Sequence, residues 1–208
     1  MMPEKSKPKS TGPRPGKRAL ILKAARELFL ATGLEATSMD QIAAAAGVSK
    51  ATLYNHFESK DALFAEVMRA QYETLAEDLG QVDADALPVK ALADFARRLI
   101  GLVTRPEHVS LVRVIIGVAA SNPAISEAYF RYGKAAAFRA LGAYLAAKVA
   151  DGTFEIDDVY LAGMQFLGAI KEPLLWPRVL GGAPRGEVED VVDRAVRMAM
   201  AEWQPQRT

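Results

Sequence analysis

Hydrogen-bonding side chains gather between Thr37 and Lys60, and their types suit the recognition of nucleic acid. The amide of Asn55 carries the donor and the acceptor that pair with adenine in the major groove, and the ammonium group of Lys50 can reach guanine acceptors or a phosphate. Ala51 is small enough to allow a close approach to base edges. The other donors suit phosphate oxygens, which fix the register of a protein on DNA: Thr37, Ser38, Thr52, Tyr54, His56 and Lys60.

Three helix starts and one glycine turn must position these side chains. Ser38, Ser49 and Ser59 each precede a helical pattern, and a serine hydroxyl accepts a hydrogen bond from the free amides of a helix start. Gln41 follows Ser38 by three residues, which is the spacing of a reciprocal capping box. Gly47 predicts the end of the first short helix, because glycine enters the left-handed conformation without a steric penalty. Two short helices around a tight turn form a helix-turn-helix.

The second short helix has an apolar face and a polar face. Leu53 and Phe57 are four residues apart, so they share the face that must be buried. Ala51 and Asn55 then point to the opposite side, towards a partner. A helix of this kind lies in the major groove with its N-terminal residues at the base edges. Taken one at a time, these features also fit an ordinary helical domain.

In combination, the features resemble one known family. The matching positions are Gly47-Val48-Ser49, Leu53-Tyr54, His56-Phe57 and Lys60-Asp61-Ala62-Leu63. They resemble the N-terminal DNA-binding domain of the TetR family of transcriptional regulators, over about residues 18–66. The resemblance implies a ligand-responsive repressor that binds double-stranded operator DNA and is released by a small hydrophobic effector. Residues 111–180 resemble the AcrR/AefR-like branch of this family, which regulates efflux and membrane-related genes.

Charge is unevenly distributed along the chain. The 208 residues have a formal net charge of +1, but residues 1–60 contain 10 Lys or Arg and 5 Asp or Glu, which is +5, and residues 61–208 carry −4. A basic N-terminal part is the electrostatic footprint expected of a DNA-binding protein. The length and the 50% hydrophobic composition allow a core much larger than one small DNA-binding module needs.

Residues 1–17 are rich in Lys, Arg, Pro and Gly and are predicted to form a disordered basic tail. This tail is either a solvated leader or an arm that touches phosphates or the minor groove. A secretion signal is not expected, because Lys23, Arg26 and Glu27 follow the short apolar run at residues 19–22. No stretch approaches the roughly 20 apolar residues that a bilayer requires. We therefore expect a cytoplasmic protein with no membrane partner.

Helical periodicity dominates the remaining chain and predicts an all-α fold. An apolar stripe at residues 21–29 completes an N-terminal three-helix helix-turn-helix DNA-binding domain at residues 18–62. Residues 63–208 are predicted to form a C-terminal helical ligand-binding and dimerisation domain, which a long helix from Lys60 to Gly80 joins to the first. Further helices are predicted at residues 89–104, 107–120, 123–150, 156–176 and 187–203.

The C-terminal helices carry more apolar residues than one stripe per helix requires. A filled helical core explains this surplus, and so does an apolar ligand cavity, which the TetR resemblance favours. The predicted pocket residues are Phe95, Leu99, Arg113, Ile116, Phe138, Met164, Gln165 and Trp176. Tyr132 is a further polar anchor that is equally compatible with a surface position.

Two apolar stripes on the last helices predict an association surface between two copies of the chain. Small residues in these stripes permit close packing of helices in a two-fold bundle, although internal packing would produce the same pattern. The predicted interface residues are Phe166, Ile170, Val188, Val191, Val192, Ala195 and Ala199. A homodimer would place the second helix of each helix-turn-helix, the reading helix, in successive major grooves, roughly 34 to 36 Å apart. It would therefore require a palindromic operator.

Two other classes of protein are alternatives to a transcriptional regulator. A nonspecific DNA-binding protein would use the basic tail and would show little preference for any operator. An enzyme has little support, because the chain has only His56 and His108, no cysteine, and no cluster of side chains with the spacing of metal ligands. We expect no catalytic residue, metal or cofactor, and we expect His108 at the surface or the edge of the core. Asp157 and Asp158 are interpreted as helix-capping residues.

Overall fold

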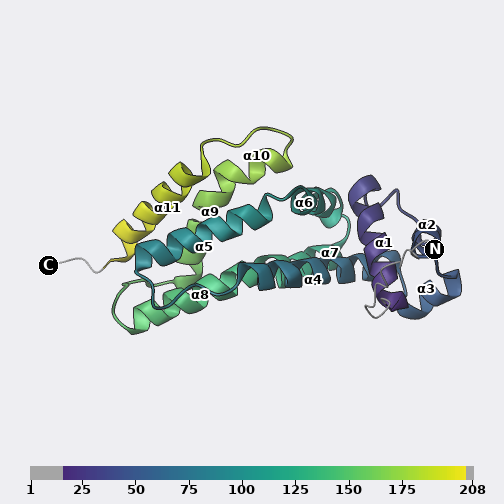
Figure 1. The fold of residues 1–208 in the computed structure, drawn as a ribbon, viewed down its shortest axis with the longest axis horizontal. Coiled ribbons are helices and arrows are strands. Elements are labelled where there is room, and N and C mark those ends of the chain that lie inside the picture. Colours follow the sequence, from purple (N-terminus) through teal and green to yellow (C-terminus); the bar gives the residue numbers. More distant parts are fainter. Residues whose placement is uncertain (1–15, 205–208) are drawn as a thin grey trace, which may run out of the picture.

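The computed structural model describes residues 16–204, except for the side chains of residues 134 and 136. Within this range the predicted all-α fold is confirmed, and the chain forms helices joined by short loops (Figure 1). The helices are α1 Lys17–Thr32, α2 Met39–Ala46, α3 Lys50–His56, α4 Lys60–Leu79, α5 Pro88–Val103, α6 Pro106–Ala119, α7 Pro123–Ala128, the π-helical segment η1 Tyr129–Lys134, α8 Ala135–Ala150, α9 Val159–Leu174, α10 Trp176–Val179 and α11 Val188–Trp203. All but the last two residues of the predicted tail lie outside the described range.

Local sequence signals set the N-terminal helices. The Ser38 hydroxyl accepts from the Gln41 amide at 3.2 Å, and the Ser38 amide donates to Gln41 Oε1 at 2.8 Å, so the predicted capping box is formed. Gly47 ends α2 in the left-handed conformation, with φ 65° and ψ 34°. Ser49 and Ser59 accept hydrogen bonds from the first turns of α3 and α4, as predicted.

The C-terminal helices differ from the prediction at two places. The single helix predicted at residues 123–150 is α7, η1 and α8 in series, with π-helical geometry in the middle. The helix predicted at residues 156–176 ends at Leu174, one residue after Pro173, and α10 follows. Pro177 has no amide that could donate to the carbonyl of Pro173, and this carbonyl accepts instead from the amide of Arg185 at 2.8 Å.

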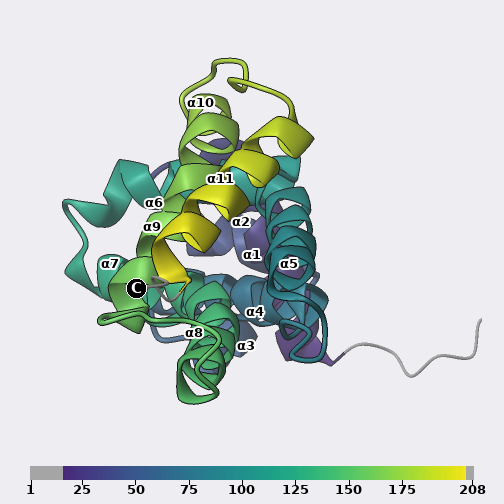
Figure 2. The same ribbon diagram turned by 90° about the vertical axis from the view of Figure 1, so that its left-hand side faces the viewer.

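Helix α4 joins two hydrophobic cores. Figure 1 shows α1, α2 and α3 at one end of the molecule and α4 running from them alongside the C-terminal helices. The N-terminal half of α4, including Phe64 and Met68, is buried with α1–α3. Its C-terminal end, with Leu75 and Leu79, is buried in the second core with α5, α8, α9 and α11. Figure 2 views the molecule from the end opposite α1–α3, with α11 crossing the view obliquely.

The N-terminal core also takes in residues from far along the chain. Leu111, Ile115 and Val118 of α6 are buried in it, together with Ile125 and Ala128 of α7. Helix α6 contacts α1 directly. A second element besides α4 therefore connects α1–α3 to the rest of the molecule.

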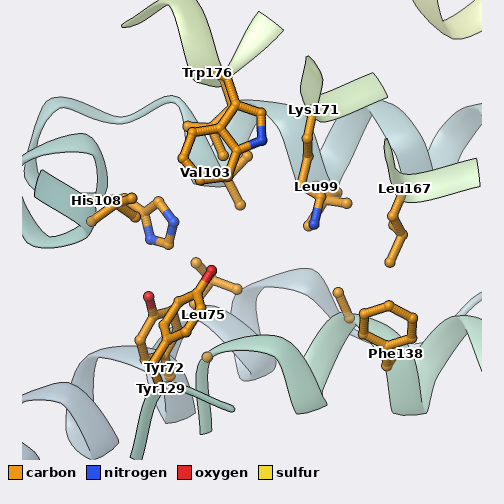
Figure 3. A pocket seen from close by; sticks show the side chains of 14 residues that line it. Tyr72, Leu75, Leu99, Val103, His108, Tyr129, Phe138, Leu167, Lys171 and Trp176 are labelled. Carbon is orange, nitrogen blue, oxygen red and sulfur yellow. The ribbon is translucent and has the colours of Figure 1, made fainter. Parts of the chain in front are cut away.

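A small cavity lies where α4, α5, α6, η1, α8 and α9 meet (Figure 3). Within residues 16–204, no helix is long and apolar enough to cross a membrane.

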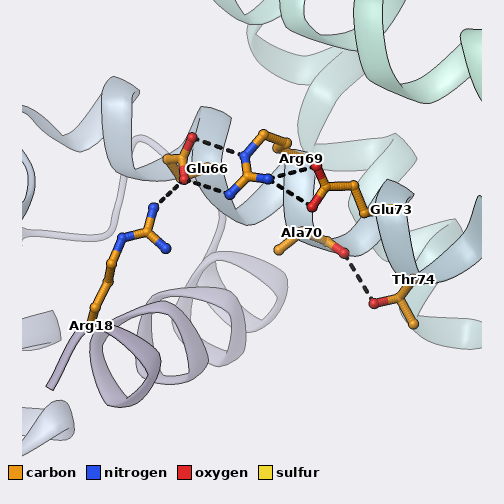
Figure 4. A network of polar contacts seen from close by, with 6 residues as sticks. All are labelled: Arg18, Glu66, Arg69, Ala70, Glu73 and Thr74. Carbon is orange, nitrogen blue, oxygen red and sulfur yellow. Dashed lines mark hydrogen bonds and ion pairs between the residues drawn. The ribbon is translucent and has the colours of Figure 1, made fainter. Parts of the chain in front are cut away.

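A charged network ties α1 to α4 (Figure 4). Arg18 of α1 pairs with Glu66 of α4, and Glu66 also accepts hydrogen bonds from Arg69 at 3.0 and 3.1 Å. Arg69 in turn donates two hydrogen bonds to Glu73, at 2.6 and 2.7 Å. These bonds from Arg69, followed by that from Arg18, lower the pKa of Glu66 although its partial burial opposes the shift. The guanidinium of Arg18 also lies 5.4 Å from the centre of the Phe57 ring, within range of a cation–π contact.

We predict that Glu66→Gln lowers the free energy of unfolding at pH 7 by about 1 kcal/mol, because it removes the charge that two arginines bind. A carboxyl group with a lowered folded-state pKa stabilises the fold above its unfolded-state pKa and loses that effect as the pH falls through the folded value. The difference between wild type and variant should therefore shrink as the pH falls from 5 towards 3. Urea unfolding across this range measures it.

Glu77→Gln is the matched control, since Glu77 is an exposed residue of the same helix. An equal loss of stability in the control, or a Glu66→Gln effect that does not change with pH, would contradict the role assigned to the network.

Candidate functional site

Helix α3 presents a polar face to solvent. Leu53 is fully buried against the N-terminal core and Phe57 is 5% exposed, as the spacing predicts. Ala51 and Asn55 are exposed on the other side, and Tyr54 next to them is 52% exposed. Since α3 follows α2 after the tight turn at Gly47, this arrangement is a helix-turn-helix with its second helix free to enter a groove.

The charged groups near α3 are placed where phosphate can reach them. Lys50 Nζ lies 2.5 Å from an Asp40 carboxylate oxygen, and both side chains are more than half exposed. Lys60, at the start of α4, donates to the backbone carbonyl of Glu35 at 3.2 Å. His56 is exposed at the end of α3. Exposed ion pairs contribute little stability, so Lys50 can exchange its partner for a phosphate at small cost.

Three of the side chains predicted to bind phosphate form hydrogen bonds within the protein instead: Ser38, Thr52 and Thr37. Ser38 is exposed, but its hydroxyl caps α2. Thr52 is half-buried, and its hydroxyl lies 2.9 Å from that of Ser49. Thr37 is 2% exposed, and its hydroxyl donates to the carbonyl of Gly33 at 2.7 Å. This corrects the prediction for Thr37: its side chain holds the loop before α2 and is not available to DNA.

The second site is the cavity between the C-terminal helices, with a volume of about 50 Å³. Its walls are largely apolar and aromatic. The lining residues are Tyr72, Leu75, Leu99, Val103, His108, Val112, Tyr129, Gly133, Ala137, Phe138, Leu167, Lys171, Leu175 and Trp176. Figure 3 shows Trp176 on one side of the cavity and Tyr72 and Tyr129 on the other, with His108 at one end.

His108 is a buried titratable group in the cavity wall. It is 7% exposed, and its ring packs edge-on against Tyr72 with 5.7 Å between ring centres. Burial lowers the pKa of His108 to about 4, with a smaller contribution from the charge of Lys171. The imidazole is therefore neutral at pH 7. Among the described residues, nothing forms a hydrogen bond with its Nδ1 atom.

Gly133 of η1 allows the two tyrosines of the cavity wall to come together. A Cβ atom at this position would lie 2.8 Å from the ring of Tyr129 and 2.9 Å from the ring of Tyr72. The two rings are 6.2 Å apart, centre to centre, at 63°. Burial raises the pKa of both phenols, so both carry a proton at neutral pH.

Three predicted pocket residues, Leu99, Phe138 and Trp176, do line the cavity. The structure places the other five elsewhere. Phe95 is fully buried in the second core, and Arg113 donates to the carbonyls of Val179 at 2.8 Å and Arg178 at 2.6 Å. The remaining three, Ile116, Met164 and Gln165, are exposed. Tyr132 packs against the N-terminal core instead of entering the cavity.

The polar wall residues Tyr72, His108, Tyr129 and Lys171 were not predicted. The expectation that His108 lies at the surface or the core edge is wrong. One signal was present, because His108 stands four residues before Val112 and so shares its apolar face on α6. Its burial still depends on α4, which is distant in sequence.

The predicted interface stripe is turned inward. Phe166, Ile170, Val192, Ala195 and Ala199 are all buried where α11 packs on α5 and α9. Packing within one protomer accounts for the burial of these five residues, and Phe166, Ala195 and Ala199 also line a groove between α9 and α11. Of the predicted set, only Val188 and Val191 are partly exposed.

Comparison with known families confirms the resemblance seen in the sequence. Residues 21–67 match the family model described as bacterial regulatory proteins, tetR family, and residues 90–205 match the AefR-like transcriptional repressor C-terminal domain. Both are models of transcriptional regulators, which confirms the prediction that the chain is not an enzyme.

Solved structures of similar sequence have the same fold along most of the chain. The flavonoid-responsive regulator FrrA is 36% identical, with a TM-score of 0.82 over 92% of this chain and 98% of that one. A putative TetR-family regulator from Mesorhizobium loti is 27% identical, with a TM-score of 0.82 over 91% and 97%.

Curated relatives match over a shorter region. The activator FasR of Mycolicibacterium smegmatis is 42% identical over 69 residues, which is 33% of this chain and 32% of that protein. The repressor KstR2 of Rhodococcus jostii is 35% identical over 81 residues, or 39% and 40%. The matches thus span between about a third and two fifths of the length of these relatives.

We predict that His108→Gln reduces the pH dependence of stability between pH 6.5 and 4. A buried histidine whose folded-state pKa is about 4 makes the unfolded state bind more protons in this range, so wild-type stability falls as the pH falls. The loss attributable to His108 is at most about 3 kcal/mol. Urea unfolding at pH 7 and pH 4.5 measures the difference.

The only other histidine supplies the control. His56→Gln should leave the pH dependence of wild type unchanged, because His56 is exposed. Identical pH dependence in wild type and His108→Gln would show that His108 is not held neutral by burial.

Proposed function

Because the chain belongs to the TetR family of bacterial regulatory proteins, we propose that it is a homodimeric repressor that binds a palindromic operator and is released by a small effector. The observation that carries this proposal is the free polar face of α3 opposite the buried Leu53 and Phe57. The match of residues 90–205 to an AefR-like repressor domain favours repression over activation.

In the proposed complex, Asn55 and Ala51 face base edges and the surrounding polar groups bind the backbone. Asn55 reads adenine through its amide, and the small side chain of Ala51 allows α3 to sit deeply in the groove. Tyr54, His56, Thr52 and Ser38 line the edges of this face, within reach of phosphate. Lys50 and Lys60 supply the positive charge that attracts the DNA and makes binding salt-dependent.

The proposed dimer uses the outer faces of α9 and α11. Leu161, Met164 and Met198 are exposed apolar residues on these faces, 50%, 38% and 66% exposed. A groove of about 690 Å³ runs between the two helices and is lined partly by Ala169 and Ala201. Small residues in such a groove let the helices of a second copy approach closely. This surface includes three residues of the predicted stripe, Phe166, Ala195 and Ala199, which also line the groove.

The proposed effector site is the cavity. FrrA is named as flavonoid-responsive, and its similarity to this chain extends across both parts of the fold, which supports a small organic effector here. Tyr72 and Leu75, in the cavity wall, belong to the same helix as Lys60 next to the reading helix. A ligand that moves this wall would change the spacing of the two reading helices. A coupling of about 1 to 3 kcal/mol is typical of such linked sites.

We predict that Asn55→Ala relaxes sequence preference at one base pair of each half-site by about tenfold, since one bidentate amide contact is lost. Lys60→Ala should instead weaken binding to all sequences similarly and lower the slope of log affinity against log salt by about 1. Selection of operators from a random DNA library, followed by titration at several salt concentrations, separates the two effects.

The proposal predicts a protected palindrome that survives excess competitor DNA. Loss of all protection in the presence of competitor would identify the chain as a nonspecific DNA-binding protein instead. If Asn55→Ala had the same sequence preference as wild type, Asn55 would not contact a base.

We predict that Met164→Glu converts the homodimer to a monomer and lowers operator affinity by at least about 100-fold, because it buries a charge in an apolar interface. Analytical ultracentrifugation measures the first effect and gel shift the second. Leu87→Glu is the control, because Leu87 is 77% exposed and precedes α5, outside the proposed surface. A dimeric Met164→Glu protein would refute the assigned interface.

A further inference from the structure

The cavity wall contains a cation but no acidic residue. Lys171 reaches into the cavity from α9, as Figure 3 shows. None of the described residues that line the cavity is Asp or Glu. Lys171 is the one charged side chain among the described residues that line the cavity, so it is the group there that can bind an anionic oxygen of a ligand.

The aromatic side chains around the cavity favour a flat ring. Trp176 lies opposite Tyr72 and Tyr129, and Phe138 closes the far end from His108 (Figure 3). Aromatic side chains on two sides of a cavity bind a planar aromatic ring by stacking and edge contacts. The Nδ1 atom of His108 is buried and has no hydrogen-bond partner within the described residues. A buried polar atom of this kind favours a ligand that brings a hydroxyl group to it.

A neighbouring depression does not share this charge preference. It has a volume of about 280 Å³ and meets the cavity at Leu75 and His108, which line both. Its charged residues balance, because Arg26 and Arg105 face Asp78 and Glu107, and Arg105 pairs with Asp78 at 3.0 Å. The preference for an anion is therefore a property of the inner cavity alone.

We propose that the effector is a planar aromatic acid whose anionic oxygen binds Lys171 and whose hydroxyl group, at the other end of the ring, binds His108. This inference rests on the proposed function, because it assigns a ligand class to the same effector cavity. It excludes the cationic and purely hydrocarbon ligands that an apolar cavity alone would also accept.

Calorimetric titration of the full-length protein, without DNA, tests the charge preference with matched probes. The probes are 4-hydroxycinnamate and its uncharged methyl ester, at pH 7.5. Wild type should bind the acid at least about tenfold more tightly than the ester, as expected for one charge-assisted hydrogen bond in a desolvated site. Equal or tighter binding of the ester, or no binding of the acid at millimolar concentration, would overturn the proposal.

Variants of Lys171 test whether this residue causes the preference for the acid. Lys171→Met should bind acid and ester equally, and Lys171→Arg should retain the preference for the acid. Lys90→Met is the control, since Lys90 is an exposed lysine of α5 outside the cavity, and it should behave as wild type. A tenfold acid preference that persists in Lys171→Met would overturn the assignment. If Lys171→Met does not fold, the wild-type comparison and Lys171→Arg still decide the question.

The hydroxyl contact has its own test. Cinnamate, which lacks the 4-hydroxyl group, should bind wild type several-fold more weakly than 4-hydroxycinnamate, and His108→Phe should bind the two equally. An unchanged ratio in His108→Phe would overturn this part of the inference. Operator footprinting without any added ligand tests the proposed function separately. A protected palindrome in a protein that shows no preference for the acid would refute the ligand class but not the proposed function.

Discussion

The burial of one helix in two hydrophobic cores is the constraint on which the structure depends. Helix α4 is 20 residues long, so it spans roughly 30 Å. Phe64 and Met68 are fully buried with the DNA-binding helices, and Leu79 is buried with the C-terminal helices. Bending or sliding α4 would expose apolar surface at one end or the other, at about 25 cal/mol per Å². Neither core can therefore rearrange unless α4 moves as well.

The parts of the fold that the sequence predicted well are those fixed by neighbours in the chain. The capping box at Ser38 and Gln41, the left-handed glycine at Gly47 and the buried pair Leu53 and Phe57 each depend on residues within a few positions. Such features are determined by backbone geometry and hydrogen bonding of one turn. They were sufficient to predict the reading helix and the family, since a helix-turn-helix is built almost entirely from local contacts.

The cavity and the association surface depend instead on which face of each helix meets which neighbour. Phe166 and Val192 were correctly predicted to lie on apolar stripes, but those stripes pack inside one protomer. Met164 was predicted to line the pocket and Met198 belonged to no predicted set, yet both are exposed on the outer faces of α9 and α11. When a helix has apolar residues on more than one face, the sequence does not show which face packs inside the protomer and which one stays exposed. Thr37 was misplaced for a related reason, because a threonine hydroxyl is equally suited to a phosphate and to a backbone carbonyl.

The size of the cavity gives the proposed switch its mechanical basis. Sites that hold small organic ligands run to roughly 300 to 1,000 Å³, far above the 50 Å³ found here. The proposed effector would therefore have to displace the wall. Two of the wall helices, α4 and α6, also enter the N-terminal core. Tyr72 and Leu75 are carried by α4, and His108 lies on α6 about two turns before Ile115, which is buried against α1–α4. Because packed cores resist compression, the proposed switch requires α4 and α6 to move as rigid bodies when the cavity expands. The charge of Lys171 would then decide which ligand produces that movement, and α4 and α6 would convey it to the reading helix.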